Sequence, residues 1–201
     1  MAAGSPHGRF LLRGSALLIV LLAVWWFCLL NPLLFLLRGS AELFGGAVFG
    51  SPAGHLVTET PSGNWSLRIA RDVEIPAASG AVRIHSIDFD MARADLVAFT
   101  FSLPVYWAIA LAAPGIRRNA RPLLAGTLLV AALEVALLLA FMEISARNVA
   151  AQLSQSQDGL LKWALRLGDY LVVNVIPFAG PFLIATALHR DLRQRALPSA
   201  S

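Results

Sequence analysis

The sequence predicts a membrane α-helical protein with four transmembrane helices, both termini in the cytoplasm, and a small antiparallel β insertion on the outer face between helices 1 and 2. Three observations favour this fold. The 201-residue chain is 57% hydrophobic and only 14% charged, which is more apolar surface than one water-soluble core would bury. Four apolar runs are long enough to cross a bilayer. Arginine clusters beside these runs agree on one orientation.

A run of roughly 18 to 20 residues without charge spans the hydrocarbon layer. Four runs meet this criterion: Gly14–Leu37, Leu96–Ala113, Pro122–Met142 and Leu171–Leu188. We interpret the first as a retained anchor rather than a cleaved signal peptide. It continues through Trp25 and Trp26 to Arg38, beyond the about 7–15 apolar residues of a signal peptide.

Arginines gather before the first run, between the second and third, and after the fourth. They are Arg9, Arg13, Arg117, Arg118, Arg121, Arg190, Arg193 and Arg195. Short basic loops remain in the cytoplasm, so all three clusters predict the same side.

The orientation divides the chain into three parts. Residues 1–37 hold the cytoplasmic N-terminus and the first helix, residues 38–95 an outer, periplasmic segment, and residues 96–201 the other three helices with a basic cytoplasmic loop and tail. We therefore expect a multi-pass protein of the bacterial cytoplasmic (inner) membrane. The net charge of +4 is modest and dispersed, which argues against a nucleic-acid partner.

The first outer segment is long enough to form a small sheet. His55–Glu59 and Trp65–Arg71 are predicted strands on either side of the turn-forming residues 61–64. A third strand is predicted over Val82–Met91. Its apolar residues change phase between Ile84 and Ile87, which predicts a β-bulge. Before the sheet, the apolar run Leu43–Phe49 is expected to lie at the interface or to extend the first helix.

Three short strands make a thin core, so we expect this sheet to lean on the membrane or on a partner. The predicted partner-binding face consists of Trp65, Leu67, Ile69, Ile87 and Phe89. The alternative is that these side chains face a self-contained core. In the second outer segment, Leu160, Leu161, Ala164 and Leu165 recur at helical spacing, which predicts an amphipathic lead-in to the fourth helix.

Glu134 is the one charged residue inside the apolar runs. Because a carboxylate at mid-membrane costs about 3 kcal/mol or more, it is expected to face protein or water. One hypothesis is a proton- or ligand-handling acid. We favour a neutral acid in an interhelical polar contact with Tyr106 and Asn174, since the apolar runs hold no second acid and no base to continue a relay.

Other candidate sites are weaker. Pro177 and Pro181 are expected to kink the fourth helix, although a substrate-binding broken helix is the alternative. His55 and His85 lack the clustered carboxylates or cysteines of a metal site. Cys28 lies in the first apolar run without a visible base. We therefore expect no metal, no cofactor and no catalytic residue.

The order of these features resembles a known family. Trp25, Trp26, Asn31 and Pro32 in the first run precede the outer segment. The residues 103–107 (Leu-Pro-Val-Tyr-Trp) lie in the second run, and Val175, Pro177 and Pro181 in the fourth. This layout is similar to small membrane proteins found beside exosortases, especially the exosortase H-associated membrane proteins. Exosortases are bacterial transpeptidases that process proteins carrying a C-terminal sorting helix.

The resemblance implies a non-catalytic membrane accessory protein of an exosortase-type protein-sorting or envelope-export system. Its implied partners are membrane lipid and another envelope membrane protein, either the exosortase or its substrate. The sorting enzyme resembles a larger protein that uses Cys, Arg and His, a set with no counterpart here. Two alternatives remain: a small ion or small-molecule carrier using Glu134 and the kinked fourth helix, and a membrane enzyme built from polar residues such as Asp95, Glu143 and Asp169.

Overall fold

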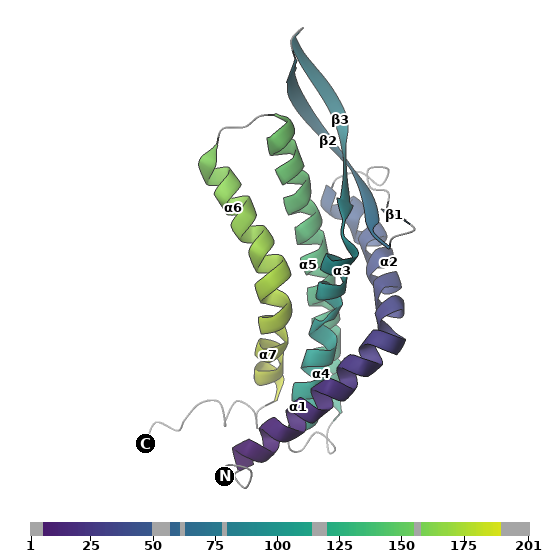
Figure 1. The fold of residues 1–201 in the computed structure, drawn as a ribbon, viewed down its shortest axis with the longest axis vertical. Helices are drawn as coiled ribbons and strands as arrows, with labels where there is room; N and C mark the ends of the chain where they lie inside the picture. The colour runs from purple at the N-terminus through teal and green to yellow at the C-terminus, as the bar shows by residue number, and fades with distance from the viewer. Residues whose placement is uncertain are drawn as a thin grey trace. The chain divides into compact units, whose positions relative to one another are not determined.

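Four long apolar helices dominate the fold. The computed structural model describes residues 6–49, 57–60, 63–77, 80–113, 120–154 and 158–189. The helices long and apolar enough to cross a membrane cover Phe10–Phe49, Arg93–Ala112, Arg121–Leu153 and Gly159–Leu188 (Figure 1). The prediction of four such helices is confirmed. The first helix continues through Phe49, so the apolar run after Arg38 extends it.

The first, second and fourth of these helices are irregular near prolines. The first comprises α1 (Pro6–Val24), the π-helical η1 (Trp25–Leu29) and α2 (Leu30–Phe49). The fourth comprises α6 (Gly159–Tyr170), the π-helical η3 (Leu171–Val175) and α7 (Ile176–Leu188). Pro32 and Pro177 follow η1 and η3 closely. A proline removes one backbone donor, and a π-turn is a common way for a helix to absorb such a defect.

The second helix is interrupted near its middle, whereas the third is continuous. α3 (Arg93–Thr100) gives way to a turn at Phe101 before α4 (Ser102–Ala112) begins. Pro104 lies in the first turn of α4, where the N–H that proline lacks would have no partner within the helix. α5 runs from Arg121 to Leu153 without interruption.

The β insertion is a three-stranded antiparallel sheet in the order β1-β2-β3. β1 covers Val57–Glu59, β2 Trp65–Ala77 and β3 Gly80–Met91. Glu59 pairs with Trp65 across the first turn, where Gly63 has a φ of 77°, a value that favours glycine. The strand predicted to end at Arg71 continues to Ala77. His55 lies outside the described residues.

The predicted bulge is present. Ala70 pairs with Ser86 and Val73 with Ile84, so β2 advances three residues while β3 advances two. The extra residue therefore lies in β2, opposite His85. The irregularity falls where the apolar phase of β3 changes, between Ile84 and Ile87.

The chain divides into two compact units. The first contains Met1–Leu33, Thr100–Glu134 and Ile176–Ser201, and in it α4 contacts both α1 and α7. Its buried core includes Leu103, Tyr106, Ala110, Val130 and Ala185. Close packing is visible at Gly180, where a Cβ would overlap the side chain of Leu133.

The second unit contains Leu34–Phe99 and Val135–Val175, hence the sheet, the second half of α5 and α6. Asn64 of the β1–β2 turn accepts a hydrogen bond from the backbone N–H of Arg93 at the start of α3 (3.0 Å). Asp158 caps α6 by accepting from the N–H groups of Leu160 and Leu161. This confirms the predicted helix before the fourth apolar run.

Candidate functional site

The first candidate site surrounds Glu134 in the first unit. The Glu134 side chain is buried, with 3% of its surface exposed. Its carboxyl accepts a hydrogen bond from the backbone N–H of Leu103, at the beginning of α4. N–H groups in the first turn of a helix lack partners within that helix. Glu134 therefore supplies an acceptor beside the interruption between α3 and α4, while its Oε1 has no hydrogen-bond partner among the described residues.

Two further polar side chains serve the same interruption. The Ser102 hydroxyl donates to the carbonyl of Pro177 (2.9 Å). That carbonyl would ordinarily bond to the N–H four residues later, but this residue is Pro181 and has none. The Trp25 indole donates to the Thr100 hydroxyl (3.2 Å). Ser102 thus satisfies a carbonyl that a proline leaves without its helical donor.

The structure does not join Glu134, Tyr106 and Asn174 into one hydrogen-bonded group. The Tyr106 hydroxyl donates to the carbonyl of Pro122 (3.0 Å) and lies 3.4 Å from Nε2 of His189. Asn174 is exposed on η3 and belongs to the second unit. The Tyr106 hydroxyl thus lies at the beginning of α5.

The predicted partner-binding face lies in a core of the second unit. Trp65, Leu67, Ile69 and Ile87 are each at most 2% exposed, and Phe89 is half-buried. The predicted alternation of apolar residues in β2 is therefore correct, but the chain itself covers these side chains. They do not form an exposed apolar patch.

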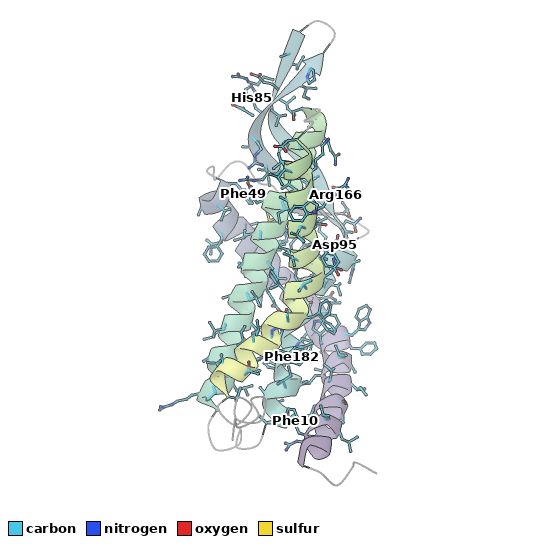
Figure 2. All side chains as sticks on the ribbon, turned by 90° about the vertical axis from the view of Figure 1, so that its left-hand side faces the viewer. Phe10, Phe49, His85, Asp95, Arg166 and Phe182 are labelled. Carbon is cyan, nitrogen blue, oxygen red and sulfur yellow. The ribbon has the colours of Figure 1, made fainter. Side chains whose placement is uncertain are left out.

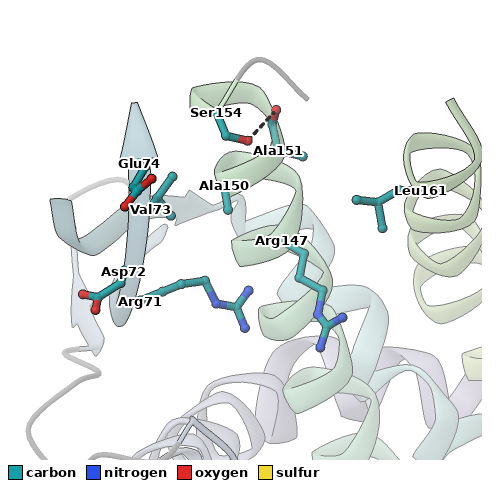
Figure 3. A pocket seen from close by; sticks show the side chains of 9 residues that line it. All are labelled: Arg71, Asp72, Val73, Glu74, Arg147, Ala150, Ala151, Ser154 and Leu161. Atoms are coloured by element: carbon teal, nitrogen blue, oxygen red, sulfur yellow. Dashed lines mark hydrogen bonds between the residues drawn. The ribbon is translucent and has the colours of Figure 1, made fainter. Parts of the chain in front are cut away.

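The second candidate site is an open groove of about 490 Å³ in the second unit. β2 forms one wall, α5 contributes the other, and Leu161 of α6 lies at its margin (Figure 3). Its charged lining comprises Arg71, Asp72, Glu74 and Arg147. The groove combines a sheet residue from the bulge with residues far along the chain, so sequence spacing alone did not indicate it.

A shared carboxylate organises the arginines of this groove. Arg71 Nη2 and Arg147 Nε both donate to Oε1 of Glu143, at 2.7 Å and 2.6 Å. Glu143 and Arg71 are largely buried, whereas Arg147 is more exposed. The Glu143–Arg147 spacing of four residues is a helical ion-pair signal, but nothing in the sequence identified Arg71 as the third member.

Other candidate residues lie outside these two sites. His85 is exposed on β3 (Figure 2), and its Nδ1 lies 2.6 Å from Oδ1 of Asp72. No group of three metal-ligating side chains occurs within the described ranges. Cys28 is exposed on η1. Asp95 and Asp169 lie close enough for their charges to interact.

Comparisons with known proteins identify the family. Searches of the curated proteins and of the solved structures return no match. The family model described as "Exosortase H-associated membrane protein" matches residues 4–192, nearly the whole chain. This match confirms the resemblance carried by the aromatic and proline motifs. The chain belongs to the exosortase H-associated membrane protein family.

Proposed function

We propose that this protein is a non-catalytic accessory component of an exosortase-type system for protein sorting or envelope export. The observation that carries this proposal is the family match over residues 4–192. The four apolar helices support a membrane location. We further propose the bacterial cytoplasmic membrane, with both ends in the cytoplasm and the sheet on the outer face, because the three arginine clusters favour that orientation.

The use of the buried polar groups supports a structural rather than a chemical role. Glu134 and Ser102 both bond to backbone groups beside the helix interruption, and Glu143 is held between two arginines. A nucleophile would need an adjacent base and access to substrate. Cys28 lies on a predicted membrane-spanning helix, where neither is evident among its described neighbours.

The helices of the first unit offer apolar surface to lipid or to a partner's helices. Along α1 and η1, large side chains are exposed: Leu11, Leu12, Ile19, Val20, Val24, Trp26 and Phe27. Helix association in a membrane depends on close packing rather than on the hydrophobic effect. A partner would therefore be recognised by the shape of this surface, and the proposed partner is the exosortase or the sorting helix of its substrate.

Deletion and complementation test the proposal in the native cell. Without this protein, substrates carrying a sorting helix should accumulate unprocessed, and the wild-type chain should restore processing. The exosortase should co-purify with the tagged chain from solubilised membranes. An unrelated four-span membrane protein carrying the same tag serves as the control. Normal processing in the deletion strain, together with no co-purification, would contradict the accessory role.

A reconstitution experiment separates an accessory protein from an enzyme. The purified chain alone should not cleave a substrate with a sorting helix, whereas its addition should raise cleavage by the purified exosortase. Cleavage by the chain alone would contradict the non-catalytic assignment while leaving the family membership unchanged.

A further inference from the structure

The groove in the second unit contains hydrogen-bonding capacity that the chain itself does not use. Arg71 and Arg147 each donate once to the same oxygen of Glu143, at 2.7 Å and 2.6 Å. A guanidinium group carries five N–H donors. Among the described residues, neither arginine has another hydrogen bond or ion pair. Several donors beside the groove therefore remain available to a ligand.

The charges at the arginine side of the groove do not balance. Two guanidinium groups face the single carboxylate of Glu143. The other carboxylates of the lining bind groups on β3: Asp72 lies 2.6 Å from His85, and Glu74 accepts from Arg83 at 2.7 Å. Figure 3 shows Arg71 extending towards α5, whereas Asp72 points to the opposite side of β2. This side of the groove therefore suits an anion with more than one acceptor oxygen.

The position of Arg147 along α5 indicates the depth of this anion site. Arg147 follows Met142, the last residue of the predicted span, by five positions, or about 7.5 Å along a helix axis. The polar layer on each side of the hydrocarbon core is roughly 5–8 Å thick. The guanidinium group is thus expected among the lipid headgroups.

The remainder of the lining is mixed, with Asp72, Glu74 and Ser154 beside apolar residues. The apolar residues are Val73, Ala150, Ala151 and Leu161. Near Leu161, α6 also exposes Leu160, Trp163 and Leu167, side chains suited to the bilayer interface. An anion held by two guanidinium groups at headgroup depth matches the phosphodiester of a phospholipid.

We propose that Arg71 and Arg147 form a binding site for the phosphate of a phospholipid headgroup. Guanidinium groups bind phosphate oxygens through paired, charge-assisted hydrogen bonds. Glu143 orients the two arginines and competes with the lipid for their donors. An acidic peptide has compatible charge, but the expected position of the Arg147 guanidinium group among the lipid headgroups favours the lipid. The site does not depend on the proposed association with an exosortase.

Lipid retention by the purified full chain tests this site. The probe is a short-chain phosphatidylglycerol added to the protein in detergent, with bound lipid measured by native mass spectrometry. Arg71→Gln and Arg147→Gln should each weaken binding about tenfold, the effect of losing one hydrogen bond to a charged group. Arg68→Gln is the matched control, because Arg68 lies on the same strand and pairs with Asp88 away from the groove. Equal binding by Arg68→Gln and Arg147→Gln would overturn the proposal.

Glu143→Gln separates a lipid site from a purely structural ion-pair group. Removing the competing carboxylate should free both arginines and strengthen phosphatidylglycerol binding. Loss of binding in a variant that still unfolds like the wild type would overturn the proposal.

If Glu143→Gln is less stable than the wild type, Arg147→Lys supplies the second test. Lysine keeps the charge but not the paired donors. Phosphatidylglycerol binding by Arg147→Lys should therefore lie between that of the wild type and that of Arg147→Gln. Binding by Arg147→Lys equal to that of Arg147→Gln would contradict the proposed geometry.

Two competitors identify the source of the anion. Inorganic phosphate should displace phosphatidylglycerol only at much higher concentration, because it lacks the glycerol and acyl parts. Displacement at matched concentration would reduce the site to a simple anion site and overturn the lipid assignment. A glutamate-rich peptide should also compete poorly. Tight peptide binding that phosphatidylglycerol does not displace would assign the groove to a protein partner instead.

Discussion

Ser102 and Glu134, two buried polar residues of the first unit, bond to backbone groups beside prolines. Ser102 bonds to the carbonyl of Pro177, whose helical partner would be Pro181. Glu134 bonds to the N–H of Leu103, next to Pro104. In lipid, no water satisfies such groups. Ser102 therefore compensates for the donor that Pro181 lacks, and Glu134 provides an acceptor for a first-turn N–H of α4.

Glu134 should tolerate an amide but not an apolar replacement. Glu134→Gln keeps an acceptor oxygen for the Leu103 N–H, so abundance and thermal unfolding in detergent should remain close to wild type. Glu134→Leu removes the acceptor and should lower the free energy of unfolding by about 1 kcal/mol, the size of an interhelical hydrogen bond in membranes. Normal abundance of Glu134→Gln with abolished activity would instead support proton chemistry.

Gly126 should be sensitive to the smallest enlargement. A Cβ there would overlap the hydroxyl and ring of Tyr106, whose own hydroxyl is fixed to the carbonyl of Pro122. Gly126→Ala should lower the free energy of unfolding by about 1–3 kcal/mol, as overpacking commonly does. Gly39→Ala is the control, because nothing lies within 4 Å of that position, and it should be neutral or slightly stabilising. The two variants are compared by thermal unfolding in the same detergent. Equal stability of Gly126→Ala and Gly39→Ala would contradict the close contact at Gly126.

At the scale of elements, the β2–β3 hairpin is longer and better covered than its sequence suggested. β2 continues past charged residues, and the apolar side chains of Trp65, Leu67, Ile69 and Ile87 in the sheet are buried. Its outer face is held by exposed pairs, including the two-bond contact between Arg68 and Asp88. The Arg68 guanidinium lowers the pKa of the Asp88 carboxyl, although such exposed pairs contribute little to stability.

Ile69 should behave as a core residue of this sheet. It is 1% exposed, so Ile69→Ala should destabilise the second unit by about 2–5 kcal/mol and reduce abundance in the membrane. Val82→Ala is the matched control on the same sheet, because half of the Val82 surface is exposed. Protease resistance of the outer segment would measure the effect. If the Ile69→Ala protein is stable and abundant but no longer co-purifies with its partner, Ile69 belongs to the partner interface and not to the core.

At the scale of the whole molecule, the arginine clusters predict the orientation that places the groove and the sheet on one side of the membrane. Reporter fusions at Gly63 and Gln155 should report the outer side, and fusions at Asn119 and Ser199 the cytoplasm. Each fusion protein keeps all four helices, and the reporter expressed alone in the cytoplasm is the control. An external signal at Asn119 would show that the orientation is wrong.

The sequence by itself determined the number of apolar helices, the family and the existence of the sheet. These properties follow from run length, from alternation and from the order of short motifs, all of which are local along the chain. It also located the bulge, because a change of phase is visible in β3 alone.

Tertiary structure decided which residues meet. Only packing shows that the Ser102 hydroxyl bonds to the carbonyl whose helical donor Pro181 lacks. It also shows that the Tyr106 hydroxyl bonds to Pro122 rather than to Glu134. The chain itself covers the inner face of the sheet. The ion-pair group of Arg71, Glu143 and Arg147 joins residues separated by 72 positions. The physical reason is that hydrophobic pattern sets which face of an element is buried, whereas the rotation and depth of its neighbours determine what that face contacts.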